Sequence, residues 1–200
     1  CLCNCGIVDI PNDIINLPKT IRSLDLSQNY ISQIPNDIHW KQLEYLSLCE
    51  NGLTKWPDSI DPDKLPNIIS LNLSQNSIAS HISLASPFAK LQTLSLEYNP
   101  FTVVPDWIAK CSELRLLSFK GCAYIQELYL SLLFNLPNLT LLDISDVTIK
   151  DIQSLNIVPK SLTLVICRRP QKDYPSNFNT SIHNVNCADE NLYSSYSKSI

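Results

Sequence analysis

One short pattern of apolar residues recurs along most of this chain, and that periodicity constrains the fold more than any other feature. In its first clear copy the pattern places apolar residues at Ile21, Leu24, Leu26 and Ile31, with Asn29 among them. The seven copies begin at Ile21, Leu43, Ile68, Leu91, Leu114, Leu139 and Leu162. Self-similarity at a period of about 20 to 50 residues indicates an array of stacked units, because no unit can bury its own apolar face alone.

Each unit contains the signals for a strand, a turn and a return segment. The Leu-x-Leu alternation predicts a short strand with one buried face. An asparagine three residues later can hydrogen-bond the backbone of neighbouring coils. The return segments at 34–38, 56–60 and 104–108 carry a Pro-x-x-Ile sequence, so proline fixes φ where they begin and the isoleucine is expected to point inward.

This pattern resembles the leucine-rich repeat family over roughly residues 2 to 167. The resemblance implies an α/β solenoid, a curved horseshoe with a concave parallel β-sheet and irregular or 3-10 convex segments. We therefore divide the chain into an N-terminal cap and partial repeat (1–20), about seven repeats (21–167) and a C-terminal cap and tail (168–200). In the partial repeat, Leu2, Cys5 and Ile7 align with Leu26, Asn29 and Ile31.

The cysteines near both ends look like those of capped extracellular members of the family. Cys1, Cys3 and Cys5 crowd the N-terminus, and the stretch from Cys167 to Cys187 is similar to the latter half of an extracellular C-terminal cap. The resemblance implies at least one disulfide within the N-terminal trio, with its pairing open, and a Cys167–Cys187 bond. Closing that loop of about 20 residues would contribute about 3 kcal/mol.

A reduced interpretation fits the same cysteines. Cys5 and Cys122 occupy the position that asparagine holds in other repeats, and Cys167 occupies a leucine position. Free cysteine is a small hydrophobe that suits such places. We favour an extracellular or cell-surface location, with a cytoplasmic location as the alternative. Asn72, Asn138 and Asn179 begin Asn-x-Ser/Thr sequences, and we expect glycans at Asn138 and Asn179 rather than on the concave strand at Asn72.

Composition and motifs exclude several classes of function. The net charge of −4 argues against nucleic-acid binding, and no apolar run approaches the roughly 18 residues of a membrane span. His39, His81 and His183 fall at unrelated positions, and three scattered glycines cannot form a phosphate loop. We expect no metal, no cofactor and no catalytic site. A chain that begins at Cys1 and has no methionine suggests a processed or excised segment.

Function is therefore expected on the concave face, where outward side chains of successive strands form rows. Leu116 and Leu141, with Leu164 and Ile166, predict an apolar strip where earlier repeats carry polar residues. An exposed apolar strip usually marks a contact, although a C-terminal cap could also cover it. If the apolar strip is exposed, we expect Leu141→Asp to abolish partner binding without unfolding the chain.

A second feature of the concave rows is a set of aromatic and charged side chains among serines. Tyrosine is enriched at binding hot spots, which makes this set a candidate for partner contact. The complete set of candidate partner-binding residues is Tyr45, Asn72, Glu97, Tyr98, Leu116, Lys120, Leu141 and Asp143.

The sequence thus predicts a recognition module that binds a protein ligand or receptor on its concave face, as a secreted protein or receptor ectodomain. An intracellular adaptor or regulatory subunit and an enzyme inhibitor acting by surface occlusion remain alternatives. Oligomeric state is left open.

Overall fold

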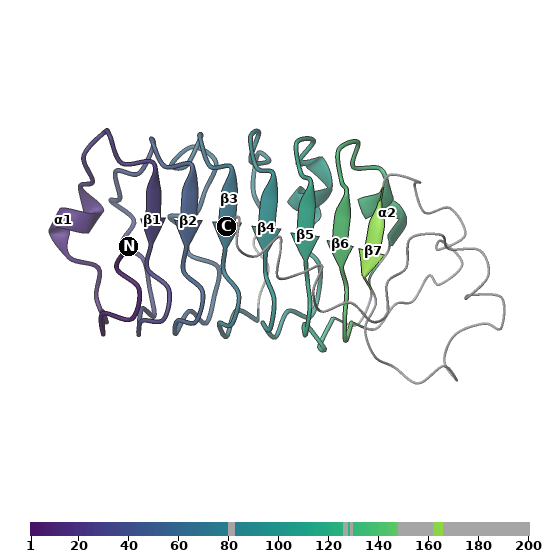
Figure 1. Ribbon diagram of the computed structural model, residues 1–200, viewed down its shortest axis with the longest axis horizontal. Coiled ribbons are helices and arrows are strands. Elements are labelled where there is room, and N and C mark those ends of the chain that lie inside the picture. The colour runs from purple at the N-terminus through teal and green to yellow at the C-terminus, as the bar shows by residue number, and fades with distance from the viewer. Residues whose placement is uncertain (80–82, 126–127, 129, 148–161, 166–200) are drawn as a thin grey trace.

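The computed structural model describes residues 1–79, 83–125, 128, 130–147 and 162–165. Its strands lie side by side in one parallel sheet in the order β1 to β7 (Figure 1). The strands are β1 (Ser23–Asp25), β2 (Tyr45–Ser47), β3 (Ser70–Asn72), β4 (Thr93–Ser95), β5 (Leu116–Ser118), β6 (Leu141–Asp143) and β7 (Thr163–Val165). Short helical elements are α1 (Asn12–Ile15), the 3-10 helix η1 (Asp106–Lys110) and α2 (Leu130–Phe134).

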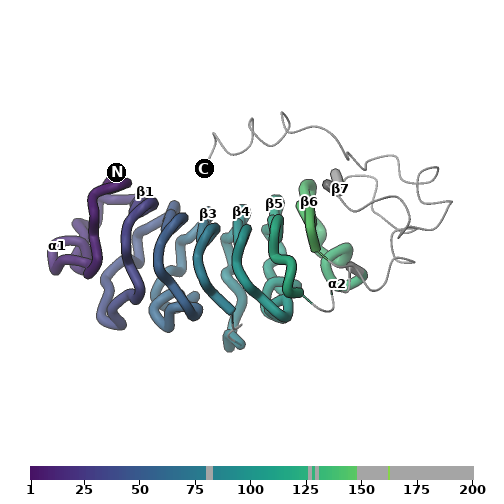
Figure 2. Tube along the Cα trace, turned by 90° about the horizontal axis from the view of Figure 1, so that it is seen from below, coloured from purple at the N-terminus to yellow at the C-terminus, as the bar shows by residue number. Residues whose placement is uncertain are grey.

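The repeat pattern sets the register of this sheet. The central leucines of successive strands pair directly, as Leu46 does with Leu71 and Leu71 with Leu94. Viewed along its edge, the solenoid carries the strands on one side and the return segments on the other (Figure 2). The leucine-rich horseshoe expected from the sequence is confirmed.

The core lies between the sheet and the return segments. The isoleucines of the Pro-x-x-Ile sequences, Ile38, Ile60 and Ile108, are buried as predicted. Trp56 and Trp107 are buried as well, and their rings meet edge to face with centroids 5.3 Å apart. Apolar side chains thus fill the interior along the array, so each repeat depends on its neighbours for burial.

Asparagine side chains connect the coils where the chain leaves each strand. The Asn76 amide donates to the carbonyl oxygens of Leu48, Leu73 and Ser74, and its Oδ1 accepts from the Leu53 N–H at 3.1 Å. These bonds satisfy backbone groups that the turn would otherwise leave buried and unpaired. Their geometry confirms that these asparagines hydrogen-bond the backbone of neighbouring coils, as the sequence predicts. We call the row of equivalent positions along the array the asparagine ladder.

Cysteine replaces asparagine in the ladder at one repeat. Cys122 is buried, and its Sγ donates to the Leu96 carbonyl oxygen at 3.2 Å. Asn99 reaches the equivalent carbonyl of Leu73 in the preceding repeat. Cys122 therefore keeps one ladder bond and otherwise fills space as a small hydrophobe.

The N-terminal residues repeat the same bonding pattern beside β1. The N–H groups of Leu2 and Asn4 donate to the carbonyl oxygens of Asp25 and Ser27. The N–H of Ile7 donates to Asn29 Oδ1 at 2.9 Å, just as the N–H of Ile31 donates to Asn51 of the repeat that follows it. The first residues therefore align as the second half of a repeat.

The register predicted for the last repeat was wrong by one residue. Leu164 pairs with Leu142 at the centre of the strand, whereas the sequence alignment placed it beside Leu141. A spacing of 22 residues (164 − 142) accounts for the difference, where 23 was expected. Leu164 therefore does not belong to the apolar row, and Ile166 lies outside the described residues.

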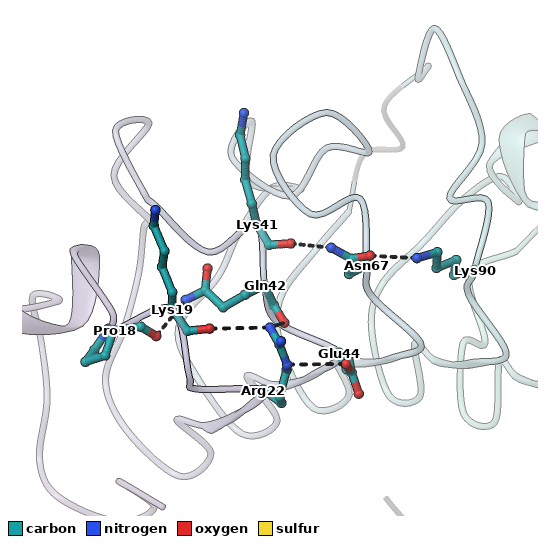
Figure 3. Close-up of polar contacts among 8 residues, drawn as sticks. All are labelled: Pro18, Lys19, Arg22, Lys41, Gln42, Glu44, Asn67 and Lys90. Atoms are coloured by element: carbon teal, nitrogen blue, oxygen red, sulfur yellow. Dashed lines mark hydrogen bonds and ion pairs between the residues drawn. The ribbon is translucent and has the colours of Figure 1, made fainter.

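At the edge where the chain enters the strands, polar side chains bridge successive repeats (Figure 3). Asn67 donates to the Lys41 carbonyl oxygen and accepts from Lys90 Nζ at 2.7 Å. Arg22 Nε lies 3.6 Å from Glu44 Oε1. Side-chain contacts at this edge therefore link successive repeats.

Candidate functional site

The concave face has a hollow of about 590 Å³ that lies over β1 to β4 and reaches Leu116 at the start of β5. Tyr45, Asn72, Glu97 and Leu116 line this hollow, so the structure brings these predicted residues together. The other predicted residues, Tyr98, Lys120, Leu141 and Asp143, do not line it. The predicted surface is therefore divided between a hollow and a separate cluster nearer the C-terminus.

Short hydrogen bonds between serines and carboxylates hold the floor of the hollow. Asp25 Oδ1 accepts from the Ser27 hydroxyl at 2.6 Å, and the hydroxyls of Ser27 and Ser47 are 2.7 Å apart. The Ser74 and Ser95 hydroxyls are 2.6 Å apart in the same way. Small side chains that bond to one another leave the space above them open and fix its shape.

Three carboxylates, Asp25, Glu50 and Glu97, set the electrostatics of the hollow. None of the lining residues is a lysine, arginine or histidine. Burial, together with the negative charges of Glu50, Glu97 and Asp25, raises the pKa of the Cys49 thiol to about 11. All three carboxylates thus disfavour the charged form of the Cys49 thiol.

A second cluster combines Glu97, Tyr98, Lys120 and Asp143. Burial opposes the charge of Lys120, but Tyr98, Asp143 and Glu97 hold the pKa of this lysine above its ordinary value. Burial raises the pKa of Glu97, against hydrogen bonds from Ser118 that lower it. Nearby negative charge thus offsets the charge of Lys120.

The apolar strip predicted to be exposed is buried. Leu116 and Leu141 pair on adjacent strands and are 9% and 4% exposed. Side chains that face each other across neighbouring strands lie close enough to cover one another. Leu141→Asp is therefore expected to destabilise the fold, which corrects the expectation that it would affect binding alone.

Asp143 is also inaccessible, contrary to the prediction of a surface contact. It is 1% exposed, and its Oδ1 accepts from the Ser145 N–H at 2.9 Å and the Ser145 hydroxyl at 2.6 Å. Burial raises the pKa of this carboxyl, and the two bonds from Ser145 oppose that rise. Asp143 stabilises its own turn instead of presenting a free carboxylate.

The cysteines of the described chain are free thiols, so no disulfide joins Cys1, Cys3 and Cys5. Cys1 Sγ lies 3.1 Å from Asp25 Oδ2, and Cys5 Sγ lies 3.4 Å from the Cys3 carbonyl oxygen. The Cys1 sulfur thus contacts the neighbouring coil, whereas the Cys5 sulfur contacts the backbone of its own segment. The residues of the predicted C-terminal bond, Cys167 and Cys187, lie outside the described residues, as does Asn179.

Asn138 and Asn72 differ as sites for modification. Asn138 is exposed, and its amide donates to the Ser112 carbonyl oxygen at 2.9 Å. Asn72 is half-buried in the hollow, and its Oδ1 accepts from the Ser74 N–H at 3.0 Å. The difference in exposure agrees with the expectation that a glycan suits Asn138 better.

Sequence reasoning missed a row of left-handed residues beside the hollow. Gln28, Glu50, Gln75 and Tyr98 have φ between 51° and 56°, and Gly121 has φ of 71°. Most of these residues are not glycine, so the glycine positions of the sequence do not reveal the row. The signal that could have found this row is its place directly before each ladder position, where the chain turns out of the strand.

Gly121→Ala is expected to lower the free energy of unfolding by about 1–3 kcal/mol. A Cβ at this position would meet the Tyr98 ring, at 2.6 Å from Cε1 and closer still to Cδ1. Urea denaturation measures the loss. Gly6→Ala is the matched control, because its φ is 68° and nothing lies within 4 Å of the added Cβ. Equal losses in the two variants would show that backbone strain, rather than contact with Tyr98, dominates.

Glu97→Gln is expected to stabilise the protein at neutral pH. The folded-state pKa of Glu97 lies above its ordinary value because of burial, so its contribution to stability is lost as pH rises through that pKa. The advantage of glutamine should vanish at pH values below the ordinary glutamate pKa, where both side chains are neutral. Urea denaturation of both proteins at neutral and acidic pH measures the difference. A constant difference would contradict this explanation.

Within the described residues no group of three or more His, Cys, Asp or Glu side chains is placed to hold a metal ion. No helix in that part of the chain is long and apolar enough to span a bilayer.

A family model described as Leucine Rich Repeat matches residues 20–40 and 90–111. An internalin of Listeria monocytogenes superposes with a TM-score of 0.67 at 20% identity, over 86% of this chain and 48% of its own. The plant peptide hormone receptor RGFR1, solved in complex with RGF2, gives a TM-score of 0.57 at 24% identity, over 76% of this chain and 26% of its own. The repeat sequence and the fold of this chain are those of leucine-rich-repeat proteins.

Two proteins of known sequence are also similar. Tubulin-specific chaperone E of Bos taurus is 31% identical over 147 residues, which cover 70% of this chain and 28% of the chaperone. A protein described as a disease resistance protein, from Arabidopsis thaliana, is 28% identical over 159 residues, which cover 76% of this chain and 18% of that protein. The chain thus spans less than a third of either relative.

Proposed function

We propose that this chain is a recognition module that binds a protein partner through the concave face, with the hollow over β1 to β4 as the contact surface. Leucine-rich-repeat proteins bind protein partners, and the similar proteins include a receptor and a chaperone. The observation that carries the proposal is the hollow itself, which combines the exposed Tyr45 ring with hydrogen-bonding side chains. The proposed action is binding without catalysis.

A matched pair of variants tests this location. Gln75 is exposed and lines the hollow, whereas Gln33 is exposed and lies outside it. Affinity purification with wild-type protein, Gln75→Arg and Gln33→Arg compares the same substitution at both places. We expect wild type and Gln33→Arg to retain a common protein partner that Gln75→Arg loses. A partner that binds Gln75→Arg as well as wild type would contradict the proposed surface.

We also propose the secreted or cell-surface setting, supported by the sequence resemblance of the Cys167 to Cys187 stretch to an extracellular cap and by the exposed Asn138. Intact mass after thiol alkylation, before and after reduction, tests the setting on protein from its native source. Protection of Cys167 and Cys187 until reduction and a glycan at Asn138 are expected. Eight freely alkylated cysteines would instead support the intracellular adaptor.

A further inference from the structure

The hollow over β1 to β4 is more specific chemically than a general protein-binding surface. Among the outward rows of the described strands and turns, the acidic residues are Asp25, Glu50, Glu97, Asp143 and Asp146. The basic residue in those rows is Lys120, which already interacts with Tyr98, Asp143 and Glu97 and does not line the hollow. Asp25 and Glu50 therefore place negative charge on the N-terminal half of the concave face, and no lysine, arginine or histidine lines the hollow beside them.

A buried hydroxyl in the wall of this hollow has no hydrogen-bond partner. Ser70 is 4% exposed, and its Oγ makes no hydrogen bond. Its backbone neighbours in register are Tyr45 and Thr93. Because a buried polar group without a partner is costly, the Ser70 hydroxyl marks a position that a polar group from outside can satisfy.

Tyr45 lies beside Ser70 and adds an aromatic ring to the lining of the hollow. Its side chain is 41% exposed and lines the hollow, so its ring is accessible to an occupant. Aromatic faces attract cations, and arginine does so while also donating several hydrogen bonds in a planar fork. Carboxylates, an aromatic ring and an unpaired hydroxyl together match a guanidinium better than an ammonium or an apolar side chain.

We propose that the hollow binds an extended, arginine-bearing segment of the protein partner, an inference that rests on the concave face being the recognition surface. Asp25 on β1 and Glu97 after β4 are three strand spacings apart, which is about 14 Å at 4.8 Å per strand. An extended peptide advances about 3.4 Å per residue, so basic residues about four positions apart reach both ends of the hollow. Ser70 and Tyr45 contact the segment between them.

A labelled peptide with two arginines spaced in this way, in an alanine and serine background, tests the proposal by fluorescence anisotropy. The comparison peptide carries citrulline, which has nearly the same shape as arginine but no charge. We expect saturable binding of the arginine peptide, at least about tenfold weaker binding of the citrulline peptide, and weaker binding as salt screens the charges. Absence of binding, or equal binding of the two peptides, would overturn the proposal.

Charge-neutralising variants locate the binding. Glu50→Gln, alone and with Asp25→Asn, is expected to weaken binding of the arginine peptide about tenfold. Asp37→Asn with Asp58→Asn changes the net charge equally at exposed positions outside the hollow, and we expect it to leave the affinity unchanged. Equal weakening by both pairs would reveal only general electrostatic attraction. Glu50 is exposed, so its single variant tests the site even if the double variant fails to fold.

Failure of this inference can be told apart from failure of the proposed function. If the arginine peptide does not bind but Gln75→Arg still abolishes capture of the protein partner, the concave face is the recognition surface and its ligand is not basic. If Gln75→Arg and Gln33→Arg both retain the partner, the proposed surface is itself wrong.

Discussion

Leu71→Asp is expected to unfold the protein. Leu71 is 0% exposed at the centre of β3, between Leu46 and Leu94 of the neighbouring strands. An unpaired charge in such a place costs several kcal/mol, which is comparable to the total stability of about 5–15 kcal/mol of a typical domain. Far-ultraviolet circular dichroism and thermal melting measure the effect.

The next residue along the chain supplies the control for Leu71→Asp. Asn72 lies on the opposite face of the same strand and is half-buried in the hollow. Asn72→Asp introduces the same carboxylate one position further along, and we expect it to leave most of the stability intact. If Leu71→Asp melted at the wild-type temperature, the register of the whole array would be wrong.

Asn76→Ala is expected to cost several kcal/mol, the second largest effect. Removal of this amide leaves the buried Leu53 N–H and the Leu48 carbonyl without their side-chain partner. Each buried polar group left unpaired costs about 1–3 kcal/mol. Chemical denaturation by urea gives the difference in the free energy of unfolding.

Two further variants define the cause of that loss. Asn67 makes its bond to Lys41 at the exposed edge, so Asn67→Ala is expected to cost about 1 kcal/mol or less. Asn76→Cys imitates Cys122, which keeps one bond to a carbonyl, and should fall between the two. An Asn76→Ala variant as stable as Asn67→Ala would show that water replaces the ladder bonds.

The concave candidates show where sequence reasoning succeeds and where it ends. Periodicity identifies which residues point outward, and Tyr45, Asn72, Glu97 and Leu116 do line one hollow. Periodicity does not report accessibility, so Leu141 and Asp143 were placed on the surface although they are 4% and 1% exposed. Their burial depends on contacts with other strands and turns, which no single repeat encodes.

The most informative residue of the hollow was missed. Ser70 looks like any other serine in the rows, and nothing in its local sequence distinguishes it from Ser23 or Ser47. Its significance comes from a buried hydroxyl without a partner. Whether a hydroxyl has a hydrogen-bond partner depends on the residues that the fold places around it. Only the tertiary structure therefore shows that Ser70 lacks one.

The sequence by itself determined the repeat, its register through β6, the inward leucines and the asparagine ladder, because these follow from local periodicity and from backbone groups that every coil must satisfy. Only the tertiary structure decided which outward residues stay accessible and how their charges combine. Stacking joins Asp25, Glu50 and Glu97, which lie up to 72 residues apart (97 − 25) in the chain, around one hollow. The negative electrostatic potential that these carboxylates share depends on the distances between them in space. Their spacing along the chain does not specify those distances.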